Sequence, residues 1–330
     1  MVAFLGYRHI DLSAKVLGVA LVAEIGIVVI LDLAILVHPG PAGITFESFA
    51  PSTFLEGAIG VAVLFALTGF IGFESTAVFR DEARSPERTI PRATYAAVLI
   101  IGGFYAFTCW AFVVAIGPDF VAEAAQRTLD GEANMLLDTT NDQLGRIGRD
   151  LVNVLLLTSL FACVLSFHNV IARYQFVLAG MRVLPAALAR VHPKHHSPSV
   201  SSVVQTVTAA VIVGVFAVFD VDPLVGVFGS MAGVATVGMT ILMLLTSVAV
   251  IVFFSRNAHL RDGRRWRTII VPVIASLGLL AAMIIVLSNF TLVTGNSVEL
   301  STMLAIVPFV ALVIGWFIGG RQRAEVPASG

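Results

Sequence analysis

Eight long apolar stretches restrict the fold of this 330-residue chain more than any other feature of its sequence. Each is close to or longer than the roughly 20 residues that a helix needs to cross a bilayer. They run from Leu12 to Val37, Phe54 to Phe79, Thr89 to Ile116, Leu151 to Phe176, Val200 to Phe219, Leu224 to Phe254, Ile269 to Leu287 and Leu300 to Ile318. The sequence therefore predicts an all-α integral membrane protein, a polytopic helical bundle of about eight transmembrane helices.

The composition agrees with a membrane protein, since 58% of residues are hydrophobic, 12% are charged and the mean hydropathy is +0.94. A soluble domain carries roughly 25% charged residues. The sequence shows no phosphate-binding loop, dinucleotide fingerprint, zinc-ligand spacing or serine elbow. An intramembrane enzyme or a channel would need paired catalytic groups or a ring of charges, and neither pattern is visible. We expect a protein in a lipid bilayer with no enzyme activity, no cofactor or metal, and no nucleic-acid partner.

The basic residues are distributed unevenly between the two sets of loops. If the first span starts in the cytoplasm, all of the 20 Lys and Arg residues except Arg127, Arg146 and Arg149 fall on the cytoplasmic side. Lys and Arg collect in cytoplasmic loops of membrane proteins. This asymmetry predicts a multi-pass protein of the cell membrane with both termini in the cytoplasm.

The second apolar stretch is interrupted by the run Thr68-Gly-Phe-Ile-Gly-Phe-Glu74. At 1.5 Å per residue, Gly69 lies near the middle of the bilayer. Irregular backbone at that depth is tolerated only where it lines a protein or water cavity. A broken helix exposes carbonyls on one side and amides on the other, which suits a small zwitterion. The predicted substrate-binding residues are Gly69, Phe70, Ile71, Gly72, Phe73 and Glu74. The alternative is that the glycines serve close helix packing.

An ordered motif follows the interruption: the acidic pair Asp81-Glu82, then Arg84-Ser-Pro86, then Ile90-Pro-Arg92. Asp81 and Glu82 are predicted to pair with Arg84 and Arg88, and Pro91 suits the first turn of the next helix. Together with the broken helix, this motif resembles the signature of the amino acid-polyamine-organocation permease superfamily. The resemblance implies a secondary active transporter of amino acids or related amines. A salt-bridged loop without a role in gating is the alternative.

On this resemblance, the eight spans correspond to the fifth to twelfth helices of the family. Its fold has two inverted five-helix repeats, and the substrate binds between two broken helices. Residues 12–37 would be the remnant of the first repeat, 54–254 the second repeat, 269–318 two further helices and 319–330 a cytoplasmic tail, all in one transmembrane domain. Because four helices are absent, we expect a truncated transporter. The alternative is a transport-incompetent membrane fragment, or a subunit whose partner supplies complementary helices. The sequence also leaves open whether the chain forms a homo-oligomer.

Three ionisable residues within the apolar spans are candidates for coupling or gating. Glu24 lies near mid-depth of the first span, where an ionised side chain costs about 2.5–3.5 kcal/mol. Asp32 lies nearer the outer surface, and His168 lies within the fourth span. Coupling to protons or sodium is the functional interpretation. Structural hydrogen bonds are the alternative for Glu24 and His168, and Asp32 is expected to reach water.

The segment Gly117 to Arg149 is too polar to cross a membrane and is predicted to lie outside it. The spacing of Phe120, Val121, Ala124, Ala125 and Leu129 predicts a short amphipathic helix. Two interpretations remain open for this segment, a solvated loop and an element that covers a gate.

Overall fold

The computed structural model describes residues 10–55, 57–78, 85–191, 198–261, 265–295 and 297–325. These residues are helical or connect helices, and no strand occurs among them. Seven of the described helices are long and apolar enough to cross a membrane. The long helices are α2 (Ile10–Val37), α6 (Pro86–Ile116), α8 (Met135–Gly180), α9 (Ser199–Val218), α10 (Ser230–Arg256), α11 (Val271–Ser288) and α13 (Val298–Glu325). The predicted all-α, polytopic membrane architecture is confirmed.

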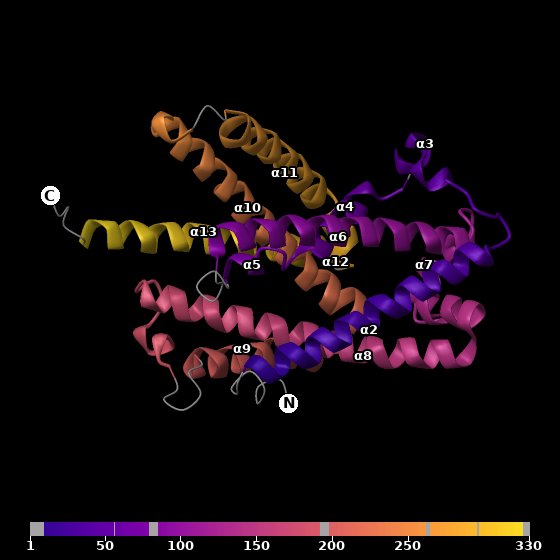
Figure 1. The fold of residues 1–330 in the computed structure, drawn as a ribbon. Helices are drawn as coiled ribbons and strands as arrows, with labels where there is room; N and C mark the ends of the chain where they lie inside the picture. Colours follow the sequence, from indigo (N-terminus) through magenta and orange to yellow (C-terminus); the bar gives the residue numbers. More distant parts are fainter. Residues whose placement is uncertain are drawn as a thin grey trace. The chain divides into compact units, whose positions relative to one another are not determined.

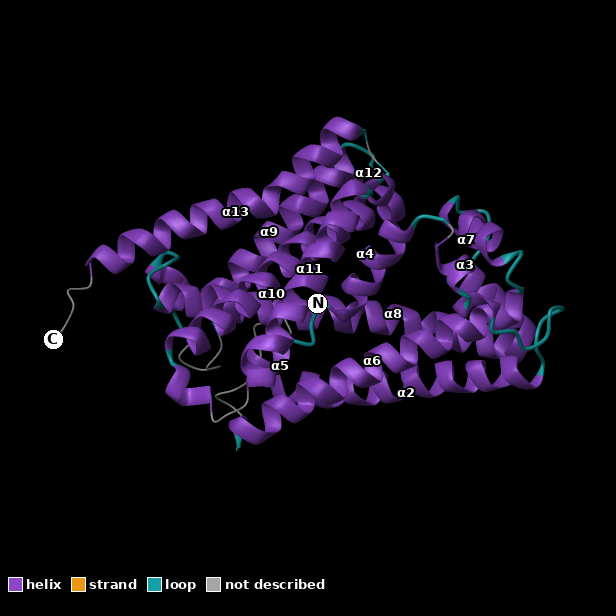
Figure 2. Cartoon of the chain, turned by 90° about the horizontal axis from the view of Figure 1, so that it is seen from above, coloured by secondary structure: helices purple, strands orange, loops and turns teal. Residues whose placement is uncertain are grey.

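Shorter helices join or interrupt these spans, and Figure 2 shows the helices in purple and the connecting loops in teal. The α-helical ones are α3 (Pro51–Leu55), α4 (Ile59–Phe70), α5 (Ser75–Val78), α7 (Val121–Leu129) and α12 (Phe290–Thr294). Single 3-10 turns occupy Glu47–Phe49, Ala186–Ala189 and Ala258–Arg261, and π-helical turns occupy Pro223–Gly229 and Trp266–Ile270. The remaining predicted span, Phe54 to Phe79, is thus divided between α3, α4 and α5.

The chain divides into two compact units, and one boundary falls inside the predicted binding segment. The first unit holds residues Met1–Thr53 and Phe73–Phe219, and the second holds Phe54–Gly72 and Asp220–Gly330. The predicted second repeat, residues 54–254, is therefore shared by both units. The grouping of helices into repeats stays a prediction.

In the first unit, α2, α6 and α8 contact one another, and α9 packs on α8 (Figure 1). The core between α2 and α6 is apolar, with Leu31 and Ile35 on α2 facing Ala111 and Val114 on α6, all at most 1% exposed. The predicted amphipathic helix is present as α7, which contacts the ends of α6 and α8.

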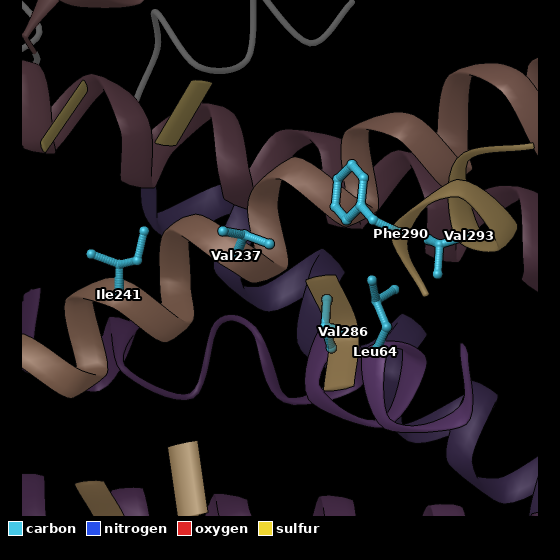
Figure 3. Packing of buried hydrophobic residues seen from close by; sticks show 6 residues of the cluster. All are labelled: Leu64, Val237, Ile241, Val286, Phe290 and Val293. Atoms are coloured by element: carbon cyan, nitrogen blue, oxygen red, sulfur yellow. The ribbon is translucent and has the colours of Figure 1, made fainter. Parts of the chain in front are cut away.

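In the second unit, α10 contacts α4, α11, α12 and α13. Figure 3 shows the core that these helices share, in which six buried side chains from α4, α10, α11 and α12 meet. They are Leu64, Val237, Ile241, Val286, Phe290 and Val293. Gly233 lets α10 approach the ring of Phe290, because a Cβ on Gly233 would come within 2.9 Å of that ring. The first half of the broken span, α4, is in this way held by packing.

Two helices, α8 and α13, extend beyond the predicted spans by more than a helical turn. α8 begins at Met135 rather than Leu151, because Asn134 caps it: the Asn134 side chain accepts a hydrogen bond from the Leu137 amide at 3.1 Å. Within α8, Gly145 has φ 70° and ψ −176°, so the helical backbone is interrupted there. α13 continues to Glu325, so the predicted tail from residue 319 is helical up to that point.

Candidate functional site

The predicted interruption of the second span is present in the backbone. α4 ends at Phe70, and Ile71 then adopts extended geometry with ψ 127°. Gly72 follows with φ 112°, in the region that L side chains rarely adopt. Residues 71–74 form turns, and α5 begins at Ser75. Helical geometry is therefore lost between Phe70 and Ser75, and glycine stands at the residue with positive φ.

The end of α4 is fixed by a hydroxyl pair beside the second unit's core. The Thr68 hydroxyl donates to the Leu64 carbonyl at 2.8 Å and lies 2.6 Å from the hydroxyl of Thr236 on α10. Because Thr68 has one hydroxyl proton and gives it to Leu64, Thr236 is the donor between the two hydroxyls. The Thr68 carbonyl accepts from the Ile71 amide at 3.0 Å. The last turn of α4 is thus held in place directly before the break.

The chain after the break is anchored to α6 and α8. The Thr76 hydroxyl donates to the Phe73 carbonyl at 3.1 Å and lies 2.7 Å from the Thr94 hydroxyl on α6. α5, which follows the break, also contacts α8. Both sides of the break are therefore attached to long helices, one side in each unit.

The two predicted acids have different surroundings. The expectation that Asp32 reaches water is wrong: the residue is completely buried, and its Oδ2 accepts a hydrogen bond from the Thr108 hydroxyl on α6 at 2.8 Å. Glu24 is half-buried on α2. Asp32 Oδ1 and Glu24 Oε1 are enclosed and have no hydrogen-bond partner among the described residues. Each enclosed oxygen is costly as part of a carboxylate anion, because nothing described in its surroundings donates to it.

His168 is buried at the interface of α8 and α9. Its Nε2 lies 2.9 Å from the Ser202 hydroxyl. The ring also lines a mainly apolar groove of about 360 Å³, together with Phe167 and Gln205. The hydrogen bonds of His168 and Asp32 thus go to α9 and α6, and neither goes to the break.

The motif after the break is only partly covered by the structure. Asp81, Glu82 and Arg84 lie outside the described residues, so their predicted ion pairs stay predictions. The prediction that Pro91 lies in the first turn of the next helix is wrong. α6 begins at Pro86, whose missing N–H suits the first helical position, so Pro91 lies inside the helix.

Among the described residues, no group of three or more His, Cys, Asp or Glu side chains is placed to hold a metal ion. The expectation of no metal or cofactor stays a prediction. The polar groups at the break are backbone carbonyls, amides and one carboxylate, which are partners for a small charged solute.

Comparison with known proteins decides the family. A family model described as amino acid permease matches residues 1–318. The chain belongs to the amino acid permease family. The superfamily resemblance carried by the Asp81–Arg92 motif is confirmed, and the long apolar helices agree with a multi-pass membrane protein.

Curated relatives of the permease carry transporter names. The serine/threonine exchanger SteT of Bacillus subtilis is 28% identical over 46% of this chain and 34% of its own length. The branched-chain amino acid permease BcaP of the same species is 23% identical over 87% of this chain and 57% of its own length. An uncharacterized transporter of Mycobacterium tuberculosis is 30% identical over 48% of this chain and 33% of its own length. The permease chain thus spans between a third and just over half of these relatives.

Sequence reasoning missed the threonines that hold the break in this permease. Thr68 directly precedes Gly69, so the sequence offered a signal for it. Thr236 and Thr94 offered none, because isolated threonines in apolar helices are common and their partners are distant in sequence. Thr236 is 168 residues from Thr68, and only the packing of α4 on α10 brings the two hydroxyls together.

Proposed function

We propose that this permease is a secondary active transporter that moves amino acids or related amines across the cell membrane. The substrate binds at the break formed by Gly69, Phe70, Ile71, Gly72, Phe73 and Glu74. The observation that carries the proposal is the loss of helical geometry between Phe70 and Ser75 in an otherwise apolar span. Family membership and the relatives' printed names support it.

The substrate ammonium binds at the C-terminal end of α4. The last four carbonyls of a helix have no amide partner within that helix, and they form the negative end of the helix dipole. One of these carbonyls, that of Thr68, accepts from Ile71. The carbonyls of Gly69 and Phe70 belong to the same turn. Because Gly69 and Gly72 have no side chain, a ligand can approach the backbone closely.

The substrate belongs to the neutral amino acids. Phe70, Ile71 and Phe73 flank the glycines, and all three are half-buried, so the break offers apolar contact for a side chain. The relatives are named for serine and threonine in one case and for branched-chain amino acids in the other. These are small, uncharged side chains, which suit an apolar surface better than an additional charge does.

Transport is coupled to protons through Glu24. The enclosed Oε1 of Glu24 has no donor among the described residues, and neutralisation by a proton removes the cost of a buried charge. Glu24→Gln mimics the protonated acid and is expected to flatten the pH dependence of uptake, with Asp119→Asn, at an exposed acid outside the long apolar helices, as the control. An unchanged pH profile in Glu24→Gln, or uptake that requires sodium at every pH, contradicts this assignment.

Both termini lie in the cytoplasm. The distribution of Lys and Arg supports this topology, since only Arg127, Arg146 and Arg149 lie on the opposite side. Green fluorescent protein fused after Glu325 is expected to fluoresce, and alkaline phosphatase at the same position is expected to be inactive. An active phosphatase fusion contradicts the topology.

Uptake by reconstituted vesicles tests the function. The purified full chain in proteoliposomes is expected to accumulate radiolabelled L-serine or L-leucine above empty vesicles when a pH gradient is imposed. Binding of these amino acids is measured in parallel in a scintillation proximity assay. Binding without uptake would indicate the alternative, a subunit that needs complementary helices or a second copy, and absence of both would contradict the proposal.

A further inference from the structure

A partly polar cavity lies in the first unit, lined by α7 and by the ends of α6 and α8. Its volume is about 290 Å³, close to the lower end of the range for small-ligand sites. α6 contributes Ala115 and Ile116 to its wall, and α7 contributes Ala124 and Arg127. The remaining lining residues come from the start of α8 and the residues before it: Ala133, Met135, Asp138, Thr139, Asp142 and Gln143.

The cavity wall carries charges of both signs on different helices. α8 brings Asp138 and Asp142, four residues apart and so on the same helix face. α7 brings Arg127, whose ion pair with Glu132 is long, at 3.7 Å, and exposed on both sides. Such an exposed pair contributes at most about 1 kcal/mol, so Arg127 can give it up for a ligand. The lining thus offers two carboxylates and one guanidinium to a single small molecule.

The two carboxylates in the lining, those of Asp138 and Asp142, differ in whether they already have a hydrogen-bond partner. Asp138 uses one carboxylate oxygen to accept from the Asn134 amide at 2.9 Å, as part of the α8 cap. The Asp142 side chain is exposed and forms no hydrogen bond or ion pair with another described residue. Its carboxylate is therefore not needed to hold the helix together.

Thr139 is the second, independent indication of a ligand. It is only 8% exposed and lines the cavity, yet its hydroxyl has no partner among the described residues. The neighbouring Thr140 shows the usual solution, since its hydroxyl donates to the Leu136 carbonyl one turn earlier at 2.7 Å. The Thr139 hydroxyl is not among the fully enclosed atoms that lack a partner, so it faces the space of the cavity, where a ligand can supply the missing hydrogen bond.

We propose that this cavity is a second binding site for a small zwitterion with an ammonium and a carboxylate, the chemistry of a free α-amino acid. Asp142 and the Thr139 hydroxyl hold the ammonium, and Arg127 holds the carboxylate. The site is separate in sequence from the break and does not depend on the function proposed for it. The headgroup of phosphatidylethanolamine also pairs an ammonium with an anion, a phosphate in place of the carboxylate. Nanodiscs with and without this lipid distinguish the two sources.

Hydrogen–deuterium exchange of the segment Gly117–Arg149 tests the site. The full chain is prepared in phosphatidylcholine nanodiscs and titrated with L-serine and with L-serinamide, which lacks the carboxylate. L-serine is expected to slow exchange in this segment at millimolar concentration, and L-serinamide to act several-fold more weakly. Asp142→Asn is expected to weaken the L-serine effect about tenfold, and Arg127→Gln to abolish the difference between the two probes.

Matched variants separate binding from folding. Thr139→Val removes the hydroxyl and is expected to weaken the L-serine effect, whereas Thr139→Ser keeps it. Asp119→Asn changes an exposed acid of the same segment that does not line the cavity, and it is expected to behave as wild type. Gly72→Leu should leave the protection intact even where binding at the break is lost.

Several results would overturn the site. They are the absence of L-serine-dependent protection in the wild type, equal protection in Asp142→Asn, and protection that requires phosphatidylethanolamine in the nanodisc and not free L-serine. The last result would assign the cavity to a lipid headgroup.

Discussion

Gly72 and Gly145 both interrupt a helix at a residue with positive φ, but in opposite surroundings. At Gly72 φ is 112°, and the flanking residues Phe70, Ile71 and Phe73 are apolar. At Gly145 φ is 70°, and the following Arg146 side chain is 84% exposed. Both glycines have a positive φ, but the side chains around them differ in polarity and exposure.

The comparison shows why one interruption is a candidate site and the other is a bend. Around Gly145, water can pair the freed amides and carbonyls, and Asp150 pairs with both Arg146 and Arg149 in the next turn. In an apolar span water is scarce, so irregular backbone such as that around Gly72 is tolerated only where it lines a protein or water cavity. The environment of a helix break therefore tells more about its role than its geometry does.

The largest effect is expected from a side chain at the break. Gly72→Leu forces a positive φ on an L residue and fills the space beside the carbonyls, so amino acid binding should fall about a hundredfold. Gly145→Leu imposes the same kind of backbone strain in open space, since a Cβ at Gly145 would meet no other side chain within 4 Å. It should bind as wild type in a scintillation proximity assay. Equal loss in both variants would show that strain, and not the site, causes the effect.

A smaller effect is expected from the core that supports α4. Leu64 is fully buried in the cluster of Figure 3, and Leu64→Ala leaves a cavity there that should destabilise the protein by about 2–3 kcal/mol. The measurement is unfolding of the purified protein in mixed micelles of increasing denaturing detergent. Leu157→Ala, at a side chain that is 62% exposed, serves as the control and should change stability little. A stable Leu64→Ala variant would argue that α4 is not held by this core.

Gly145→Ala should cost about 1 kcal/mol, the penalty of a positive φ for a residue with a Cβ. The change is read in the same unfolding titration, and amino acid binding should stay close to that of the wild type. Increased stability would mean that α8 can become straight at this position, and the bend would then not be required by the fold.

The smallest effect is expected from the hydroxyl pair before the break. Hydrogen bonds between membrane helices average about 0.6 kcal/mol, so the coupling energy of Thr68→Val and Thr236→Val should be of that size. A double-mutant cycle in the unfolding titration measures it. Additive single effects would show that the 2.6 Å contact contributes nothing to holding α4 against α10.

The apolar spans and the break could be predicted from sequence because each depends on local features. Hydropathy located the long helices, and two glycines with a carboxylate in one span located the loss of helical geometry at Gly72. The start of α8 could not be found in this way. Residues 138–150 are polar, and the signal for the helix start is the Asn134 cap rather than hydrophobicity.

Features that depend on tertiary packing could not be predicted from the sequence. Nothing local indicates that Thr236 meets Thr68, or that Thr139 is buried beneath α7 while Thr140 bonds to its own helix. The early start of α6 could not be predicted, because Pro86 and Pro91 are both compatible with the first turn of a helix. In the structure the helix begins at Pro86.

Magnetic-resonance distance measurement between substrate and backbone tests the central claim most directly. The protein is labelled with ¹³C at the carbonyls of phenylalanine and leucine, and ¹⁵N-labelled L-serine or L-leucine is bound to it in lipid. Dipolar coupling between the substrate nitrogen and the Phe70 carbonyl, with none to the Leu144 carbonyl before Gly145, is the predicted result. Bound substrate without coupling at Phe70, or with coupling that survives in Gly72→Leu, would contradict the assignment of the break as the substrate site.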